Sequence, residues 1–249
     1  MKLALHACCG PCLLEPLDAL AAEHDVTVVY ANPNIHPAAE YERRRDTLLV
    51  WAAERSVEVV EVDYDPSAWD EAVEGVEDDP SRRCRRCFGL RLAMTARVAE
   101  ELGCEGVGTT LSVSPYQDHD DIVAAGEAAC EPLAVRFVET DFRDRYPEAT
   151  RRSRELGMYR QDYCGCGRSK AEAEAGRIER AAASGRRRRG ARLLLDQVDL
   201  VAAPSDLHLG EPRIGPDDLG QRGGHRPRLL GYVDDGRVAS GIDELRERQ

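Results

Sequence analysis

Cysteine is the residue type in this sequence that offers the most chemistry. The chain of 249 residues contains nine cysteines, an odd number. Seven of them form three clusters: Cys8, Cys9 and Cys12 in HACCGPC, Cys84 and Cys87 in RCRRC, and Cys164 and Cys166 in YCGCG. The N-terminal segment shows no apolar run typical of a signal peptide, so we expect no export signal. Metal binding or redox chemistry then explains these clusters better than a structural disulfide framework.

The first two clusters together offer four thiolates from two distant segments. Cys8 and Cys9 form a CC pair, and Cys84 and Cys87 form a CxxC pair. Four thiolates suit either a structural zinc ion or a 4Fe-4S cluster. Zinc sites built from two separated segments usually show CxxC in both, so the CC pair favours an iron–sulfur cluster. A zinc ion remains the alternative. Cys84 and Cys87 are expected in the first turn of a helix, whose N-terminus lowers thiol pKa values.

The third cluster differs because one glycine separates its two thiols. Cys164 and Cys166 could close a small, strained disulfide, and strained disulfides tend to be the labile, catalytic ones. The alternative is that both residues are further metal ligands. The two remaining cysteines, Cys104 and Cys130, stand alone at the ends of helix-like stretches, where we expect small buried apolar residues.

Short apolar runs alternate with helical patterns through the first two-thirds of the chain, which is typical of a parallel α/β sheet. The expected strands are Leu3–Ala7, Val26–Ala31, Val57–Val62, Gly106–Leu111 and Arg136–Glu139. The expected helices are Leu13–Glu23, Ala38–Arg55, Ser81–Leu102, Asp118–Ala129 and Arg145–Leu156. The fold class is therefore α/β, a Rossmann-like parallel sheet flanked by helices. Ligands of such sheets bind at the carboxyl ends of the strands, where the first cysteine cluster lies.

Polar residues follow two of the expected strands at the same edge. They are Asn32, Asn34 and His36 after the second strand, and Ser112, Ser114, Tyr116, Gln117 and His119 after the fourth. Taken singly, each of them is better explained by turn chemistry or helix capping. Their convergence on strand ends that also carry thiols favours a functional site.

Composition and charge exclude several classes of protein. No apolar run approaches the length of about 18 residues needed to span a membrane, so we expect a cytoplasmic protein without membrane contact. The formal net charge of −12 argues against general electrostatic binding of nucleic acid. Local arginine runs could still contact phosphates: Arg43–Arg45, Arg82, Arg83, Arg85, Arg86, and Arg151, Arg152, Arg154 with Arg160.

The composition of the chain changes near Ala171. The residues beyond it begin with a segment of helical composition that has little apolar face. Many Gly, Pro and Asp residues follow, without sustained periodicity. We expect a catalytic domain over residues 1–175 and a weakly structured C-terminal appendage over residues 176–249.

Five motifs together resemble the QueH-type, cobalamin-independent epoxyqueuosine reductase family: HACCGPC, ANPNIHPAAEYERR, RCRRCFGLRL, TTLSVSPYQDH and YRQDYCGCGRSK. The resemblance spans about residues 1–170, and the motifs occur in the order expected for the family. It implies a fold related to the adenine-nucleotide hydrolase group. It also implies an oxidoreductase that reduces the epoxide of epoxyqueuosine to queuosine at the tRNA anticodon wobble position, the last step of queuosine biosynthesis.

The resemblance also implies roles for the cysteines. Cys8, Cys9, Cys84 and Cys87 would hold a 4Fe-4S cluster, and Cys164 and Cys166 would form a redox-active disulfide. The family is further associated with a single additional iron, which Cys12 could serve. The partners would be a tRNA with a queuosine-type anticodon and an electron donor that the sequence does not identify.

The chemistry implied by the family agrees with the residue types. Converting an epoxide to an alkene needs two electrons and two protons, and water departs. A cluster moves one electron at a time, whereas a thiol pair stores two. A general acid must protonate the departing oxygen, and His119 and Tyr116 are the candidates.

Two other functions compete with this hypothesis. An ATP-dependent tRNA thiolase of the same fold group also carries cysteine pairs, but it needs a Gly/Ser-rich pyrophosphate loop after the first strand. This sequence has CCGPC at that position, with a single glycine and a proline. A zinc-stapled RNA-binding module is the alternative without enzymatic activity. Iron and sulfide in the protein would separate the reductase from the zinc module.

Overall fold

Short apolar runs build a parallel sheet in the computed structural model, which describes residues 1–199, with side-chain surroundings up to residue 183. The strands are β1 (Lys2–His6), β2 (Asp25–Tyr30), β3 (Val59–Glu61), β4 (Gly106–Thr109) and β5 (Arg136–Phe137). They pair in the order β3-β2-β1-β4-β5, and every pairing is parallel. The predicted Rossmann-like α/β class is confirmed.

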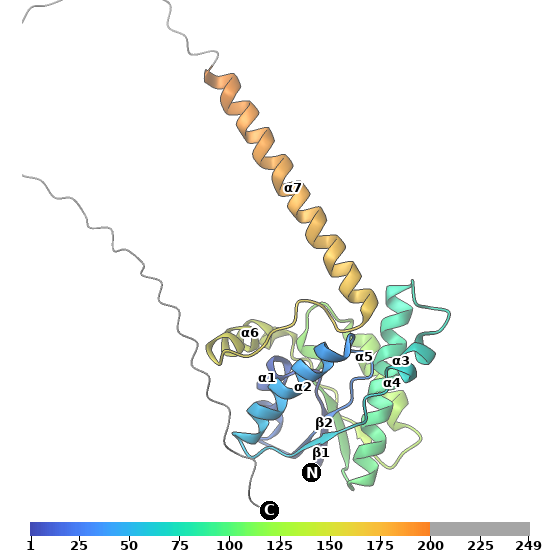
Figure 1. Cartoon of the computed structure of the whole chain (residues 1–249). Helices are drawn as coiled ribbons and strands as arrows, with labels where there is room; N and C mark the ends of the chain where they lie inside the picture. The colour runs from blue at the N-terminus through green and yellow to red at the C-terminus, as the bar shows by residue number, and fades with distance from the viewer. Residues whose placement is uncertain (200–249) are drawn as a thin grey trace, which may run out of the picture. The chain divides into compact units, whose positions relative to one another are not determined.

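Helices cover both faces of the sheet (Figure 1). On one face, α1 (Gly10–Leu20) contacts α2 (Ala38–Ala53) and α6 (Tyr146–Glu155). On the other face, α4 (Pro80–Glu101) packs along α5 (His119–Cys130) and against β1. This layered arrangement is the one that parallel strands with helical crossovers require.

The core has two halves because successive strand residues point to opposite faces of the sheet. Leu3 and Leu5 of β1 join the apolar cluster beneath α1 and α2, whereas Ala4 joins the cluster beneath α4. Cys104 and Cys130 belong to the cluster that contains Ala4, and both are buried. The prediction that these two cysteines are small core residues is confirmed.

The sequence prediction omits one short helix, and two others, α1 and α4, begin earlier than predicted. The short helix α3 (Pro66–Val73) follows Asp65, whose side chain caps it by accepting from the Ser67 amide. Asp79 caps α4 in the same way through the Arg82 amide. In both cases Asp-Pro marks the helix start, a signal that was present in the sequence.

The last described helix, α7 (Gly167–Asp199), crosses the predicted boundary at residue 175. The remainder of the expected appendage, residues 200–249, lies outside the described residues. Within the part of the chain that is described, none of the helices combines the length and apolar character needed to cross a membrane.

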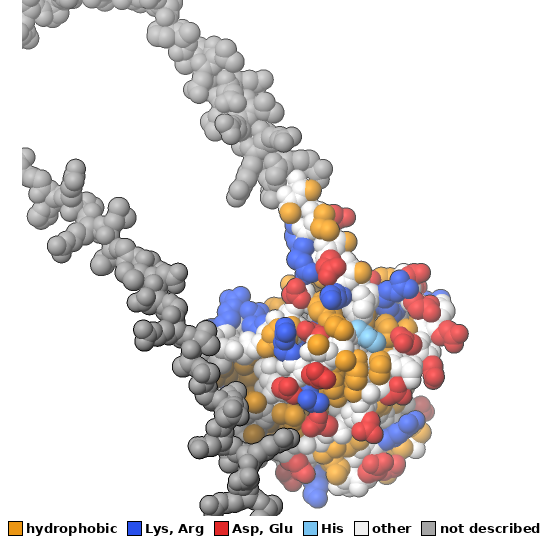
Figure 2. Space-filling model, viewed as in Figure 1, with side chains coloured by type: hydrophobic (Ala, Val, Ile, Leu, Met, Phe, Trp, Pro, Cys, Tyr) orange, Lys and Arg blue, Asp and Glu red, His pale blue; other side chains and the backbone are white. Residues whose placement is uncertain are grey.

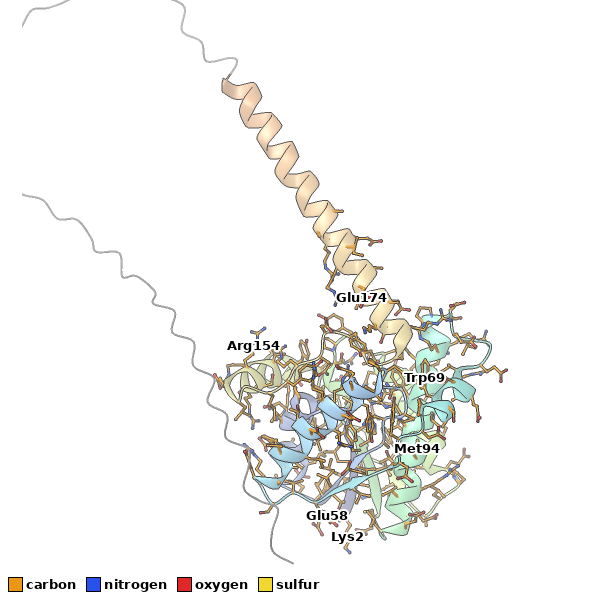
Figure 3. The ribbon with its side chains drawn as sticks, viewed as in Figure 1. Lys2, Glu58, Trp69, Met94, Arg154 and Glu174 are labelled. Atoms are coloured by element: carbon orange, nitrogen blue, oxygen red, sulfur yellow. The ribbon has the colours of Figure 1, made fainter. Side chains whose placement is uncertain are left out.

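Different elements of the chain lie at the two ends of the sheet. Lys2 and Glu58 mark the amino ends of β1 and β3, whereas Trp69 of α3 lies toward the opposite end (Figure 3). On the face seen in Figure 2, acidic and basic side chains are interspersed over the coloured part of the molecule. That face therefore presents no extended field of one sign.

Candidate active site

The first cysteine cluster lies where the strand order of the sheet reverses, between β1 and β4. This switch point is the usual ligand crevice of an open α/β sheet. Cys8, Cys9 and Cys12 follow β1, and their sulfur atoms all lie within 4.8 Å of one another. Thr110 follows β4 and holds the first of them: its Oγ1 accepts from the Cys8 amide at 3.4 Å and donates to Cys8 Sγ at 3.8 Å. Three convergent thiols of this kind fit a thiophilic metal.

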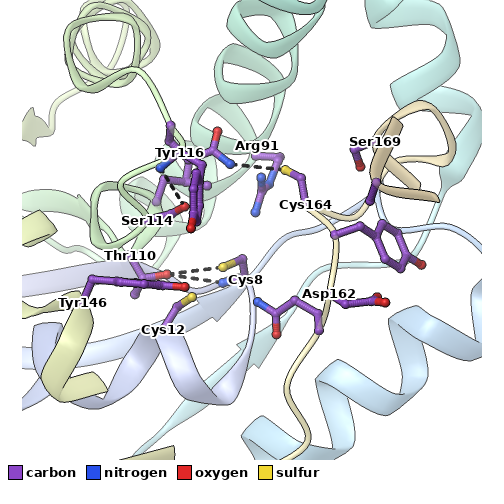
Figure 4. Close-up of a pocket in the computed structure, with 15 residues that line it drawn as sticks. Cys8, Cys12, Arg91, Thr110, Ser114, Tyr116, Tyr146, Asp162, Cys164 and Ser169 are labelled. Carbon is purple, nitrogen blue, oxygen red and sulfur yellow. Dashed lines mark hydrogen bonds between the residues drawn. The ribbon is translucent and has the colours of Figure 1, made fainter. Parts of the chain in front are cut away.

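A pocket of about 440 Å³ opens beside this cluster (Figure 4). Its lining combines thiols with hydroxyl, amide and charged groups: Cys8, Cys12, Arg91, Thr110, Leu111, Ser114, Tyr116, Gln117, Tyr146, Gln161, Asp162, Tyr163, Cys164, Ser169 and Ala173. The pocket therefore brings the first cysteine cluster and the CGC segment to one cavity. Cys9 lies behind this lining, where its sulfur accepts a hydrogen bond from Gln161 Nε2 at 3.0 Å.

The three clustered thiols do not share one protonation behaviour. Hydrogen bonds with Cys12 and Cys9 hold the pKa of Cys8 well below its ordinary value, and the nearby Arg91 charge lowers it further. Hydrogen bonds with Cys8 and Cys9, together with burial, raise the pKa of Cys12 well above its usual range. Cys8 is thus the thiol of this cluster that most readily becomes the thiolate a metal requires.

Cys84 and Cys87 are the fifth and eighth residues of α4, which begins at Pro80, so both lie beyond its first turn. The predicted lowering of their pKa values by the helix N-terminus is not observed. Burial raises the pKa of Cys84 to about 12 and that of Cys87 to about 11. A bound metal would have to displace these protons. Among the described residues, the group of convergent thiols at single-ion spacing contains Cys8, Cys9 and Cys12 but not this pair.

The CGC segment places its two thiols in different surroundings. Cys164 is exposed to the pocket, and its sulfur accepts a hydrogen bond from Gln117 Nε2 at 3.3 Å. Cys166 is buried in an apolar cluster that contains Trp69, Val73 and Cys87. Both cysteines are free thiols in this structure. The cluster around Cys166 brings the CGC segment and α4 together, which the spacing of the motifs along the chain did not reveal.

A buried ion pair holds the CGC segment in place. Arg44 of α2 is 1% exposed, and its Nε donates to Glu40 Oε1 at 2.7 Å. The same guanidinium donates to the carbonyl oxygens of Tyr163 at 3.1 Å and Cys164 at 2.8 Å. Glu40 in turn accepts from Tyr159 Oη at 2.7 Å. Fork-shaped donation of this kind fixes a backbone in a way that lysine could not reproduce.

Gly165 is required at the centre of the CGC segment. Its φ of +148° is a backbone conformation that residues with a side chain rarely adopt. A Cβ at this position would also lie 3.0 Å from Asn34 Nδ2 and 3.3 Å from Arg44 Nη1. The His36 amide donates to the Gly165 carbonyl at 2.9 Å, so the segment is fixed against the loop after β2.

The two candidate general acids lie in different places. Tyr116 lines the pocket, is 84% exposed and meets Tyr146 edge-on, with ring centroids 6.2 Å apart. His119 is the first residue of α5 and is not among the residues that line the pocket. Its Nε2 lies 3.6 Å from Glu139 Oε1. The structure therefore brings Tyr116, but not His119, to the thiols.

Two arginines of the predicted phosphate-contacting runs are buried instead: Arg44 pairs with Glu40, and Arg83 pairs with Glu172. Asp162, a residue of the YRQDYCGCGRSK motif without a predicted role, lines the pocket. A signal for Arg44 was present, since an acidic residue four positions earlier on a helix favours an ion pair.

The comparisons with known proteins agree with these motifs. The model of the family described as epoxyqueuosine reductase QueH matches residues 3–172. The chain belongs to this family. It is 36% identical over 167 residues to epoxyqueuosine reductase QueH of Dehalococcoides mccartyi, covering 66% of this chain and 90% of that one. It is 37% identical over 169 residues to the protein of that name in Thermotoga maritima, covering 65% and 86% of the two chains. The predicted family and its enzyme class, an oxidoreductase, are confirmed.

A solved structure is also similar, at a lower level. It is the U34-tRNA thiolase NcsA from Methanococcus maripaludis with its [4Fe-4S] cluster, with a TM-score of 0.42 and 14% sequence identity. The match covers 70% of this chain and 64% of the thiolase chain. Similarity at this level carries none of that protein's chemistry to this chain.

Proposed function

We propose that this chain reduces the epoxide of epoxyqueuosine to the alkene of queuosine at the wobble position of a tRNA anticodon. The observation that carries the proposal is the pocket at the strand switch point, where Cys8 and Cys12 face Cys164 from a distant segment. Membership of the epoxyqueuosine reductase QueH family supplies the reaction. The pocket volume of about 440 Å³ falls within the usual range for small-molecule sites, so one splayed nucleoside is a suitable occupant.

The metal proposed for this site is a 4Fe-4S cluster. Cys8, Cys9, Cys84 and Cys87 would be its ligands, and Cys12 would serve an additional single iron. The convergence of the Cys8, Cys9 and Cys12 sulfur atoms within 4.8 Å supports a metal at this edge. Such a cluster would supply single electrons from an external reductant to the site.

The electron pair for the epoxide would come from the CGC segment. In this step Cys164 and Cys166 lose two electrons and two protons and form a disulfide, while the epoxide becomes an alkene and its oxygen leaves as water. The Cys164 sulfur faces the pocket, and the glycine between the two cysteines allows the tight turn that a small ring needs. The network of Arg44 and Glu40 would hold this segment at the pocket during turnover.

Tyr116 is the better placed of the two candidate general acids because it lines the pocket and His119 does not. Its hydroxyl would protonate the departing oxygen. General acid catalysis typically contributes about 10²–10⁴ in rate, so Tyr116→Phe should lower kcat by at least about 10² while iron content stays unchanged. An equal loss in His119→Gln with full activity in Tyr116→Phe would move the role to the histidine.

The experiment that tests the function uses the full chain, reconstituted anaerobically with iron and sulfide. An anticodon stem-loop RNA that carries epoxyqueuosine is incubated with the protein and a low-potential reductant. We expect mass spectrometry of the digested RNA to show loss of one oxygen from the modified nucleoside. Cys104→Ala is the matched control, because this core thiol lies outside the site. Iron-loaded protein that leaves the epoxide unchanged would contradict the proposal.

A further inference from the structure

Arg91 is a buried cation for which the described residues provide no carboxylate. Its side chain is 1% exposed, and its Nη2 donates a hydrogen bond to Asn32 Oδ1 at 2.6 Å. The Nε atom is buried without a hydrogen-bond partner. Asn32 is itself fixed by donating to the Ala7 carbonyl at 2.8 Å, so the guanidinium is aimed by a rigid neighbour.

The other buried arginines of the described chain show what is unusual here. Arg44 pairs with Glu40 at 2.7 Å, and Arg83 pairs with Glu172 at 2.8 Å. A buried charge without a counter-ion carries a large desolvation penalty, so a fold that keeps Arg91 needs an anion beside it. Asn32 is neutral and cannot supply that charge.

The groups around Arg91 are thiols. The residue follows Cys87 by four positions on α4, so both lie on one face of the helix, and it lines the pocket together with Cys8 and Cys164 (Figure 4). Because none of the described carboxylates pairs with Arg91, the anion that suits it is a set of these sulfur ligands in their thiolate form.

We propose that Arg91 is the counter-charge of the metal–thiolate group at this site and that it raises the reduction potential of that group. The inference rests on the metal centre of the proposed function. Thiolates that bind iron keep a net negative charge around the metal, and net charge together with hydrogen bonds to sulfur sets the potential of a cluster. A fixed positive charge stabilises the reduced state, which is the more negative one, over the oxidised state.

The experiment measures the midpoint potential of the reconstituted full chain by redox titration, with iron per chain determined on the same samples. Arg91→Met keeps the length of the side chain and removes its charge. We expect it to favour the oxidised state about tenfold, which for one electron is a decrease of about 59 mV. Arg91→Lys should shift the potential less, because the charge remains. Arg97→Met is the matched control, since Arg97 lies exposed on the same helix and should leave the potential unchanged.

The remaining outcomes also decide the proposal. Equal potentials and equal iron content in Arg91→Met and the unaltered chain would overturn it. If Arg91→Met takes up no iron but Arg91→Lys does, the requirement for charge is supported. If neither variant takes up iron while both keep a native circular dichroism spectrum, the charge is not what matters and the proposal fails. An unaltered chain without iron would instead refute the metal centre of the proposed function, which is a distinguishable result.

Discussion

The cysteines of the core and those at the carboxyl edge of the sheet show how surroundings determine what a thiol can do. Cys104 and Cys130 pack among aliphatic side chains, and burial raises the pKa of both, to about 11 for Cys130. At the carboxyl edge of the same sheet, Cys8 is surrounded by other thiols, a threonine hydroxyl and the Arg91 charge, and its pKa is well below the ordinary value. The low pKa is particular to Cys8, since hydrogen bonds with neighbouring thiols and burial raise the pKa of Cys12 at the same edge. What distinguishes Cys8 from the core thiols is the supply of polar partners that stabilise a thiolate.

The largest effect should separate two cysteines with equal burial. Cys87 and Cys104 are each 7% exposed, so substitution by alanine removes a sulfur atom of the same exposure in both cases. Cys87→Ala should lower the iron content of the reconstituted protein to less than about a tenth of that of the unaltered chain, because a site that loses a ligand loses much of its binding free energy. It should also abolish epoxide reduction. Iron analysis and absorbance of anaerobic samples provide the measurement.

Cys104→Ala should keep iron and activity and cost about 1 kcal/mol in the free energy of unfolding, a typical value for a point substitution. If both variants lose iron alike, the division between edge and core thiols is wrong. If both keep it, Cys87 is not a ligand.

A second substitution tests whether the cysteines at the carboxyl edge of the sheet have different roles. Cys166→Ser should leave iron per chain near the unaltered value and abolish conversion of epoxyqueuosine RNA, because serine cannot form the disulfide that supplies the electron pair. Cys166 is buried near Cys87, so the alternative is that it binds the metal. Loss of iron together with activity would assign it to the metal site, and full activity would make it a structural residue.

A third substitution tests whether the hydrogen bonds from Arg44 to the CGC segment matter for activity as the thiols do. Arg44→Lys keeps the buried charge beside Glu40 but loses the fork that reaches the Tyr163 and Cys164 carbonyls. We expect about a tenfold loss of kcat with unchanged iron, since small misplacement of a reacting group is costly. Arg45→Lys is the control from the same arginine run, because its partner Asp46 is exposed. Equal kcat in both variants would contradict the positioning role.

The sequence predicted the fold well because strand alternation and helix periodicity are local signals. The thiols at the edge followed from their places after β1 and near the start of α4. What the sequence could not give was the long-range pairing of charges. Arg44, in a run of three arginines, resembles a solvated face until Tyr163 and Cys164 fold against it from more than a hundred residues away. The position of Arg91 beside several thiols likewise depends on tertiary packing.

The smallest effect is expected from a truncation of the chain within α7. The predicted domain boundary at residue 175 falls inside α7, with one residue of an ion pair on either side of it. Glu172 pairs with the buried Arg83 at 2.8 Å, and Arg177 pairs with Asp162, which lines the pocket, also at 2.8 Å. A chain that ends at Arg180 keeps both ion pairs. Its iron content, RNA conversion and thermal unfolding should match those of the full chain.

A chain that ends at Lys170 is the informative partner of this truncation. It removes Glu172 and leaves the Arg83 guanidinium, which is 3% exposed, with only the Glu77 carbonyl as a hydrogen-bond partner. Breaking a buried ion pair costs about 3–5 kcal/mol, and the exposure of Glu172 reduces that figure, so its Tm should decrease measurably. If the Arg180 truncation is already insoluble or free of iron, residues beyond 180 belong to the catalytic domain. If both truncations behave like the full chain, the first turns of α7 contribute nothing to the site, and the thiols at the sheet edge are supported by residues 1–170 alone.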